Sequence, residues 1–474
     1  MLRDRLRGEV VMPPDPGYPL ARQLQNTEYD AVEPWAIAYC ETHADVSACV
    51  RFARERGLQI HPRSGGHSFN GWSTGSGLVV DVSRMNHVEG RGATVRLGAG
   101  VQSLDALDAL RPLGRQIVTG TFPTVGAAGF LSGGGLGWQT RKFGLGSDQM
   151  MAAELVLADG RFVRCSADEE PDLFWALRGG GGGNFGIVTE FEVRTVDAPT
   201  LIRYETLWEF DAAARILAAW QEWCVAGPDE LGSSLVLLPG QFGPAGDPFL
   251  KIWGVHLGVP AELESALDEL AERAGVRPFH RTVAAPGPYS DVMHEALCGS
   301  QTVSRCHRVG TNPEAEGHRH PYTRQSYRLT DRAVTEAEAE KLIGAWDPSI
   351  EAERYLLCIA TGGAASRIGR TETAYPHRAA QFLVGYQRAS RDGELGAAAA
   401  TEITAWADRC ESVLALLGCG SYINFPSSRA GEDWGREYYG ENYDRLLKVK
   451  RAYDPDNFFR HARSIGSTPE REAG

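Results

Sequence analysis

The sequence predicts an α+β fold in two domains, and three observations support this prediction. The chain has 474 residues, which is long for one hydrophobic core and typical of two. Its first 200 residues or so contain dense glycine clusters between short strand and helix patterns. From about residue 200 to residue 415 glycine thins out and strands alternate with helices, which indicates a second domain of α+β character.

Composition and charge exclude several classes of partner. With 43% hydrophobic and 23% charged residues the chain is an ordinary globular protein, and its formal net charge of −13 argues against a nucleic acid or an anionic membrane. Residues 1–7 are rich in basic side chains, but a proline-rich stretch follows, so neither a signal peptide nor a membrane anchor is expected. We expect a cytoplasmic protein that acts on a small molecule, and the oligomeric state stays open.

Nine cysteines are scattered along the chain without any Cys-x-x-Cys spacing. In a reducing cytosol, buried or free thiols are expected rather than disulfides. The run His318-Arg319-His320 has no carboxylate or cysteine partner at metal-ligand spacing. The sequence therefore predicts no metal site.

Local signals place the elements in order. Thr42 is an N-cap signal for a helix that Gly57 ends, Asp159-Gly160 is a hairpin turn, and Asp454-Pro455 ends the last helix. In the first part of the chain we expect helices at 43–56, 103–113 and 172–178, and strands at 58–61, 78–82, 88–101, 151–157, 162–163 and 187–193. Beyond it we expect helices at 212–224, 261–274 and 442–451, and strands at 235–238, 355–359 and 382–384.

The first chemical signal is the loop Arg63-Ser64-Gly65-Gly66-His67-Ser68. Two adjacent glycines permit positive φ and turn backbone N–H groups toward one point, which favours an anion such as a pyrophosphate. The same pattern also occurs in ordinary turns. The glycine-dense stretch 121–138 indicates a close approach of backbone to a large flat ligand, yet it lacks the G-x-G-x-x-G fingerprint of a Rossmann site.

Several motifs occur together in a fixed order. They are Arg63–His67, Pro123–Gly126, Gly133–Trp138, Arg141–Leu145 with Asp148, Asp172–Ala176 with the glycines after it, Tyr422–Asn424 and Lys450–Asn457. From about residue 30 to 465 the chain resembles the berberine bridge enzyme-like FAD-linked oxidases, which share the vanillyl-alcohol-oxidase (PCMH) type of FAD-binding domain. The resemblance implies a discontinuous FAD-binding domain at 1–200 (the PCMH-type part at about 30–198) and 416–474. Residues 201–415 would be a substrate domain with an antiparallel sheet and helices.

The resemblance also implies a covalently bound FAD. The loop at 63–68 would bind its pyrophosphate and His67 would bond to the flavin 8α carbon, for which a neutral imidazole is a competent nucleophile. Doubly tethered relatives have a cysteine where this chain has Phe122, and Cys165 lies in a later strand, so we expect one covalent link and no 6-S-cysteinyl bond. The other cofactor-binding residues implied are Arg63, Ser64, Gly65, Gly66, Ser68, Thr124, Val125, Gly126, Gly129, Ser132, Gly134, Gly137, Trp138, Ile187 and Asn424.

For the chemistry, the resemblance points to Tyr422. A flavin oxidation needs a base that takes a proton from an O–H or N–H while hydride leaves the carbon. The ordinary pKa of a tyrosine is about 10, so a nearby cation or a hydrogen bond has to lower it. A packing tyrosine is the alternative. No carboxylate follows His377-Arg378 in the strand at 381–387, which argues against berberine-type bridge closure, and the further candidates are Tyr375 and Glu372.

The expected activity is oxidation of a sugar-like or secondary-metabolite alcohol with O2 reduced to H2O2. Val125 favours O2 because relatives with valine at this position tend to be oxidases, although a buried aliphatic residue explains it equally well. Eight basic residues between 305 and 328 face two acidic ones, which indicates a solvated loop, an inter-domain contact or a site for an anionic substrate group. The alternatives are oxidative decarboxylation or amine oxidation of an anionic metabolite, or flavin binding without turnover.

Overall fold

A mixed four-stranded sheet opens the chain. The computed structural model describes residues 1–243, 246–320, 322–350, 353–390, 397–429, 431 and 433–467. The sheet has the order β1 (Glu9–Val11), β2 (Ala36–Tyr39), β4 (Leu78–Asp81) and β3 (Ile60–Arg63), with β2, β3 and β4 parallel. Helix α2 (His43–Arg56) connects β2 to β3. As predicted, Thr42 caps it by accepting the Asp45 N–H, and Gly57 ends it at φ 64°. The loop at 63–68 thus begins where β3 ends.

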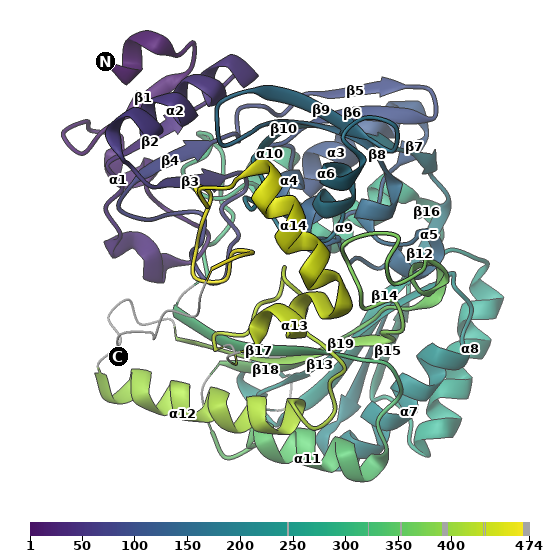
Figure 1. The fold of residues 1–474 in the computed structure, drawn as a ribbon. Coiled ribbons are helices and arrows are strands. Elements are labelled where there is room, and N and C mark those ends of the chain that lie inside the picture. Colours follow the sequence, from purple (N-terminus) through teal and green to yellow (C-terminus); the bar gives the residue numbers. More distant parts are fainter. Residues whose placement is uncertain are drawn as a thin grey trace.

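A second sheet consists of five antiparallel strands (Figure 1). Its order is β5 (Val88–Arg91), β6 (Thr94–Gly98), β10 (Ile187–Arg194), β8 (Met150–Val156) and β9 (Phe162–Ser166). The hairpin at Asp159-Gly160 is confirmed. The single strand predicted at 88–101 is wrong, because the chain turns at Gly92 (φ 68°) and pairs β5 with β6. The same part of the chain contains α3 (Ser103–Leu110), α4 (Ala127–Gly133), α5 (Thr140–Phe143), α6 (Pro171–Leu177) and the strand pair β7 (Arg115–Gln116) and β11 (Val196–Asp197).

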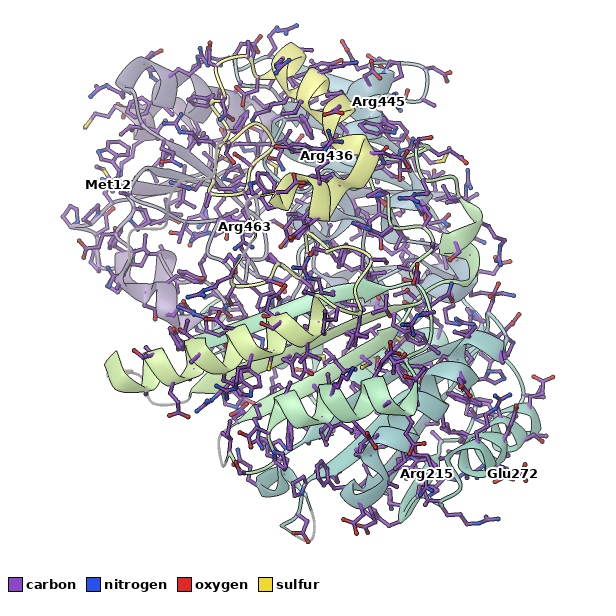
Figure 2. All side chains as sticks on the ribbon, turned by 60° about the horizontal axis from the view of Figure 1, so that its bottom comes forward. Met12, Arg215, Glu272, Arg436, Arg445 and Arg463 are labelled. Atoms are coloured by element: carbon purple, nitrogen blue, oxygen red, sulfur yellow. A yellow bond between two sulfur atoms is a disulfide. The ribbon has the colours of Figure 1, made fainter. Side chains whose placement is uncertain are left out.

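The C-terminal segment packs back onto this first part. It forms α13 (Trp434–Tyr439) and α14 (Tyr443–Tyr453), and the buried Leu446 belongs to the same hydrophobic core as the second sheet. Figure 2 labels Arg445, which pairs with Asp172 of α6 at 2.6 Å, and Arg463, which donates to the Ser427 carbonyl oxygen at 2.5 Å. The first of these contacts joins residues more than 200 positions apart in the sequence.

An antiparallel sheet forms most of the remaining structure. Its order is β15 (His280–Val283), β12 (Thr200–Glu209), β14 (Phe249–His256), β13 (Leu231–Leu238), β18 (Arg354–Ala360), β19 (Phe382–Ser390) and β17 (Tyr322–Thr330), and β16 (Gly287–Pro288) pairs with β12. One face is covered by α7 (Ala213–Ala226), α8 (Pro260–Ala274), α11 (Glu336–Trp346) and α12 (Ala397–Leu414) (Figures 1 and 2). The short helices α1 (Tyr18–Ala21), α9 (Tyr289–Cys298) and α10 (Val303–Cys306) lie outside this layer. The predicted α+β class is confirmed.

Side chains of β18 alternate between two cores. Leu356 and Cys358 pack among the covering helices, whereas Leu357 and Ile359 point to the opposite face of the sheet, toward the first part of the chain. This alternation follows from the period of two along a strand. The face opposite the helices can therefore form one wall of a site between the sheet and the first part of the chain.

The cysteine prediction needs one correction. Cys298, at the end of α9, forms a disulfide with Cys306 in α10, so not all nine cysteines are thiols. The pair lies eight positions apart, where the turn between the two helices brings the two residues together. The other seven are unbridged, and only Cys419 among them is exposed. In the described part of the chain, no helix is long and apolar enough to cross a membrane.

Candidate active site

A cavity of about 400 Å³ lies between the loop at 63–68 and the uncovered face of the large sheet. Glycine-rich segments far apart in the sequence form much of its wall: the loop itself, residues 125–129 and residues 181–184. Strands β18 and β19 contribute Leu357, Ile359 and Gln387 to the opposite wall. The tertiary fold thus brings both glycine clusters and the large sheet around one space.

Backbone donors line one end of this cavity. Gly66 has φ 69°, and the N–H groups of residues 64–68 donate to no described residue. A Cβ on Gly65 would lie 2.6 Å from the Gly126 nitrogen, so only a glycine lets these two loops meet. At Gly129 a Cβ would meet open space. The buried Ser73 hydroxyl on the same wall also has no hydrogen-bond partner within the described residues. Orphan donors beside a wall of bare backbone fit a pyrophosphate joined to a flat ring system.

The His67 imidazole lies beside these donors. Its Nε2 is 2.8 Å from the Thr124 hydroxyl. Burial lowers the pKa of His67 to about 3, and the positive charges of His320 and Arg308 act in the same direction. The ring is therefore neutral at physiological pH, with a nitrogen lone pair available for bonding.

The ring of Phe122 stands between two histidines. It lies edge-on to His67 at a centroid distance of 5.2 Å and tilted against His320 at 5.3 Å. Both neighbours line the cavity together with Phe122. No cysteine is found among the described residues that line this cavity, and Cys165 is buried in β9, where it donates to the Ala153 carbonyl oxygen.

Tyr422 also lines the cavity and is 1% exposed. Its phenolic oxygen accepts the backbone N–H of Gly135 at 2.7 Å and the Asn424 Nδ2–H at 3.1 Å. Burial raises the pKa of Tyr422 to about 12, and the two hydrogen bonds oppose this rise. Two donors to one oxygen stabilise the phenolate form of the tyrosine. In the protonated form, they leave the hydroxyl proton free to point toward a third group. The arrangement suits a proton acceptor.

Comparison with known proteins identifies the family. One family model, described as an FAD binding domain, matches residues 34–166, and another, described as berberine and berberine like, matches residues 421–466. The chain is 31% identical over 450 residues to the chitooligosaccharide oxidase of Gibberella zeae, covering 91% of this chain and 87% of that one. The chain belongs to the berberine bridge enzyme-like family. It is an FAD-dependent oxidoreductase.

Two further matches cover nearly the whole of this berberine bridge enzyme-like chain. The uncharacterized FAD-linked oxidoreductase YvdP of Bacillus subtilis is 30% identical over 482 residues, covering 97% of this chain and 98% of the relative. A solved glucooligosaccharide oxidase from Acremonium strictum has a TM-score of 0.82 and 26% identity, covering 98% of this chain and 97% of that one. The similarity thus extends over both parts of the fold.

Most cofactor residues predicted for this berberine bridge enzyme-like protein line the cavity. Four predicted residues are not among the described lining residues: Thr124, Gly134, Gly137 and Trp138. The Thr124 hydroxyl nevertheless contacts His67, which does line the cavity. Trp138 instead donates to the Ser234 hydroxyl at 3.0 Å, and a Cβ on Gly137 would lie 1.9 Å from a backbone oxygen, so both serve packing. Those that line it are Arg63, Ser64, Gly65, Gly66, His67, Ser68, Val125, Gly126, Gly129, Ser132, Ile187 and Asn424.

The two further catalytic candidates lie outside the cavity. Tyr375 is buried behind Tyr422, edge-on to its ring at a centroid distance of 5.9 Å. Glu372 is exposed, and its carboxylate accepts the Gly369 N–H at 2.7 Å. Neither residue is among the described lining residues, so Tyr422 is the remaining candidate base.

Sequence reasoning missed part of the wall. Trp72 stacks on His461 at a centroid distance of 4.4 Å, and both line the cavity. Leu357, Ile359 and Gln387 form the wall opposite the loop. For the two residues on β18, the alternation of side chains along the strand is a usable signal, since every second residue faces the cavity. No comparable local signal marks His461.

The basic stretch at 305–328 supplies no arginine to the cavity of about 400 Å³, which is the candidate FAD site and is called the flavin cavity below. Four of its five arginines form ion pairs: Arg305 with Glu316, Arg319 with Asp30, Arg324 with Glu28, and Arg328 with Glu411 and Glu437. Arg308 faces a different cavity, and only His320 of the described part of this stretch lines the flavin cavity. The geometry therefore gives no support for an anionic substrate group bound by one of these arginines in the flavin cavity.

Proposed function

We propose that this protein is an oxidase of a sugar-like or related small alcohol, with its flavin attached through His67 alone and O2 reduced to H2O2. The observation that carries the proposal is the Tyr422 oxygen, buried with two hydrogen-bond donors, in the same cavity as the unpaired N–H groups of the loop at 63–68. FAD bound there supplies the acceptor for a hydride from the substrate carbon.

Tyr422 removes the substrate hydroxyl proton in this proposal. The N–H of Gly135 and the amide of Asn424 stabilise the oxygen as it becomes anionic, and they lower the cost of a buried phenolate. Because the phenol is almost fully buried, water competes poorly for it once a substrate fills the cavity. The chain thereby couples proton removal to hydride departure.

A single tether is the second part of the proposal. His67 is neutral and its Nε2 contacts Thr124, which leaves Nδ1 for the bond to the flavin. The glucooligosaccharide oxidase of Acremonium strictum has a 6-S-cysteinyl, 8α-N1-histidyl FAD. Here Phe122 stands next to His67, and the described lining contains no cysteine, so only the histidyl link has a counterpart.

The substrate class is inferred from the cavity and its relatives. Gln387 offers an amide to hydroxyl groups, and two similar proteins are named for chitooligosaccharides and glucooligosaccharides. Val125 lines the cavity and supports O2 as acceptor. An anionic substrate in the flavin cavity is disfavoured, because four arginines of the basic stretch form ion pairs and the fifth, Arg308, lines a different cavity. We keep the division into 1–200, 201–415 and 416–474, a cytoplasmic location and a role in secondary metabolism as parts of this proposal.

Anaerobic reduction of the purified holoenzyme tests the proposal. Chitooligosaccharides and glucooligosaccharides would be mixed with it while the flavin absorbance is followed, and peroxide would be measured in air. Tyr422→Phe is expected to slow reduction by about 10²- to 10⁴-fold, the usual contribution of a general base. Tyr375→Phe removes a neighbouring hydroxyl outside the cavity and serves as the matched control. A flavin that no alcohol reduces, or full activity in Tyr422→Phe, would contradict the proposal.

A further inference from the structure

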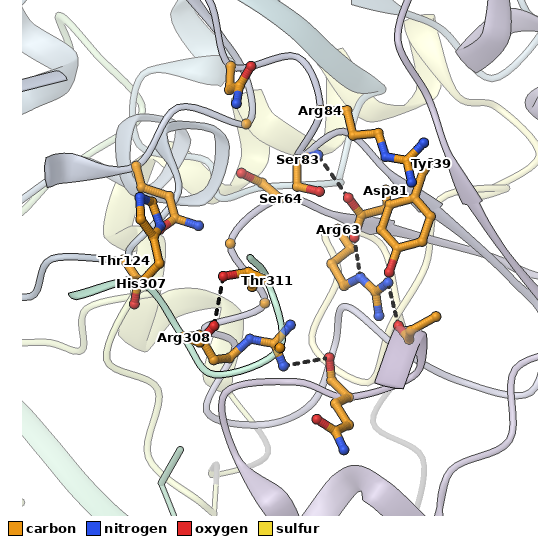
Figure 3. Close-up of a pocket in the computed structure, with 18 of the residues that line it drawn as sticks. Tyr39, Arg63, Ser64, Asp81, Ser83, Arg84, Thr124, His307, Arg308 and Thr311 are labelled. Atoms are coloured by element: carbon orange, nitrogen blue, oxygen red, sulfur yellow. Dashed lines mark hydrogen bonds and ion pairs between the residues drawn. The ribbon is translucent and has the colours of Figure 1, made fainter. Parts of the chain in front are cut away.

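A second cavity of about 520 Å³ adjoins the flavin cavity along residues 63–66 (Figure 3). Its other walls come from β1, β2, the segment after β4, the start of α3 and residues 307–312. Its floor therefore belongs to the same loop that presents backbone N–H groups to the flavin cavity. The proposed function assigns no ligand to this space.

Each carboxylate on the wall of the second cavity already has a basic side chain as a partner. Asp81 pairs with Arg63, and Glu9 pairs with Arg84 at 2.5 Å. Asp105 lies 3.0 Å from His307 Nε2, and His307 Nδ1 lies 3.0 Å from the Gln102 side-chain oxygen. The carboxylates of Asp81, Glu9 and Asp105 thus each have a basic side chain of this wall as a neighbour.

Arg308 is the cation of this wall that has no acidic partner. Its Nη1 reaches only the Gln23 carbonyl oxygen, at 3.5 Å, and no ion pair joins Arg308 to any described carboxylate. The pKa of Arg308 is lowered to about 10, chiefly by burial and further by the charges of Arg63 and Arg319. A half-buried cation among other cations is costly without a counter-charge.

Arg63 contributes a second unmet donor. This side chain is 5% exposed, and its Nε and Nη2 bond to Asp81 and the Ala21 carbonyl oxygen, but its Nη1 has no partner in the described chain. Figure 3 shows the guanidinium groups of Arg63 and Arg308 directed into the same space from two different segments. Buried donors of this kind normally have an acceptor.

We propose that the second cavity binds a small hydroxylated molecule carrying a phosphate monoester, with its phosphate between the guanidinium groups of Arg308 and Arg63. A tetrahedral phosphate offers several oxygens to two guanidinium groups at once, which a planar carboxylate does less well. The remaining wall provides the side-chain amides of Asn86 and Gln102 for hydroxyl groups. Thr311 and Asn312 also line it, but their side chains already form hydrogen bonds within residues 304–314. The cavity is several times larger than a single water, which leaves room for the body of such a molecule.

Titration of the holoenzyme with glucose 6-phosphate tests this site. Thermal unfolding would be followed in buffers matched in ionic strength with NaCl, with inorganic phosphate and glucose as separate arms. A ligand that binds only the folded chain raises the unfolding temperature in a saturable way. We expect such a rise with glucose 6-phosphate, a weaker one with inorganic phosphate, and none with glucose. A wild-type protein that responds to glucose 6-phosphate no more than to NaCl would overturn the proposal.

Variants separate this site from general charge effects. Arg308→Gln is expected to weaken binding at least about tenfold, as loss of a charged hydrogen-bond partner does. Arg305→Gln removes an exposed arginine of the same segment, paired with Glu316, and is expected to bind as the wild type does. Asn86→Asp adds a carboxylate to the wall at an exposed position, so it weakens binding even if Arg308→Gln fails to fold. Unchanged affinity in Arg308→Gln or in Asn86→Asp would contradict the assignment.

Discussion

The ring of Phe122 packs edge-on against the imidazole of His67, with centroids 5.2 Å apart. An aromatic side chain at this distance occupies the space beside the candidate flavin anchor and offers no atom for a thioether. On its far side the same ring contacts His320. Within the described residues, the Phe122 ring thus lies between His67 and His320, and no cysteine lines the cavity beside His67.

His67→Ala is expected to release all flavin when the holoenzyme is precipitated with acid, because the covalent link would be gone. The measurement is flavin fluorescence in the washed pellet and in the supernatant. Phe122→Ala, which changes the neighbouring ring, is the control and should keep the flavin in the pellet. Flavin that stays in the His67→Ala pellet would show that another residue is the anchor.

The pH dependence of flavin reduction should report Tyr422. Since burial raises its pKa to about 12, the phenolate fraction is small near neutrality and grows about tenfold per pH unit. The reduction rate is therefore expected to rise with pH. Asn424→Ala removes one donor to the phenolic oxygen and should move this rise upward by about 1 pH unit, the value of a hydrogen bond to a charged group. Gln387 lines the same cavity, and the control variant Gln387→Ala should leave the pH dependence of the reduction rate unchanged. A pH dependence that does not shift in Asn424→Ala would argue against Tyr422 as the base.

Stability toward acid should depend on His377. Its Nε2 lies 2.9 Å from the Tyr438 carbonyl oxygen, and burial lowers its pKa from 6.5 to about 4. Between pH 6.5 and pH 4 the unfolded chain binds a proton at this histidine more tightly than the folded chain does. The free energy of unfolding therefore has the full contribution of the neutral His377 above pH 6.5, and it decreases as the pH falls toward 4, by up to about 1.4 kcal/mol per pH unit. Urea unfolding of His377→Gln at neutral and acidic pH should show a shallower loss. His43→Gln, at an exposed position, is expected to keep the wild-type slope, and a wild-type slope in His377→Gln would refute the assignment.

Thiol counting distinguishes the disulfide from the free thiols that the sequence predicts. The denatured protein should give seven reactive thiols without reductant, because Cys298 and Cys306 are bridged, and all nine after reduction. In the native protein the exposed Cys419 should react first. Nine thiols in the unreduced, denatured sample would mean that the bridge is absent in the purified protein.

Several features could be predicted because they depend on neighbouring residues alone. The helix at 43–56 begins after an N-cap, Thr42, and ends at a C-cap, Gly57, and both caps are directly adjacent to it in the sequence. The Asp159-Gly160 turn similarly brings two strands together without help from distant residues. The strand predicted at 88–101 failed for the opposite reason, since its alternation continues through a turn that Gly92 makes possible.

The order of residues along the chain was enough to establish the glycine loop at 63–68, the position of His67 within it and, through the motifs, the family. What surrounds Tyr422 was settled by tertiary packing, because its oxygen meets the N–H of Gly135 from 287 positions away. Packing also separated Arg308 from the other arginines of the basic stretch, since their partners Asp30, Glu28 and Glu411 come from remote segments. Local propensity acts over a few residues, whereas burial, charge pairing and pKa depend on atoms that only packing brings together.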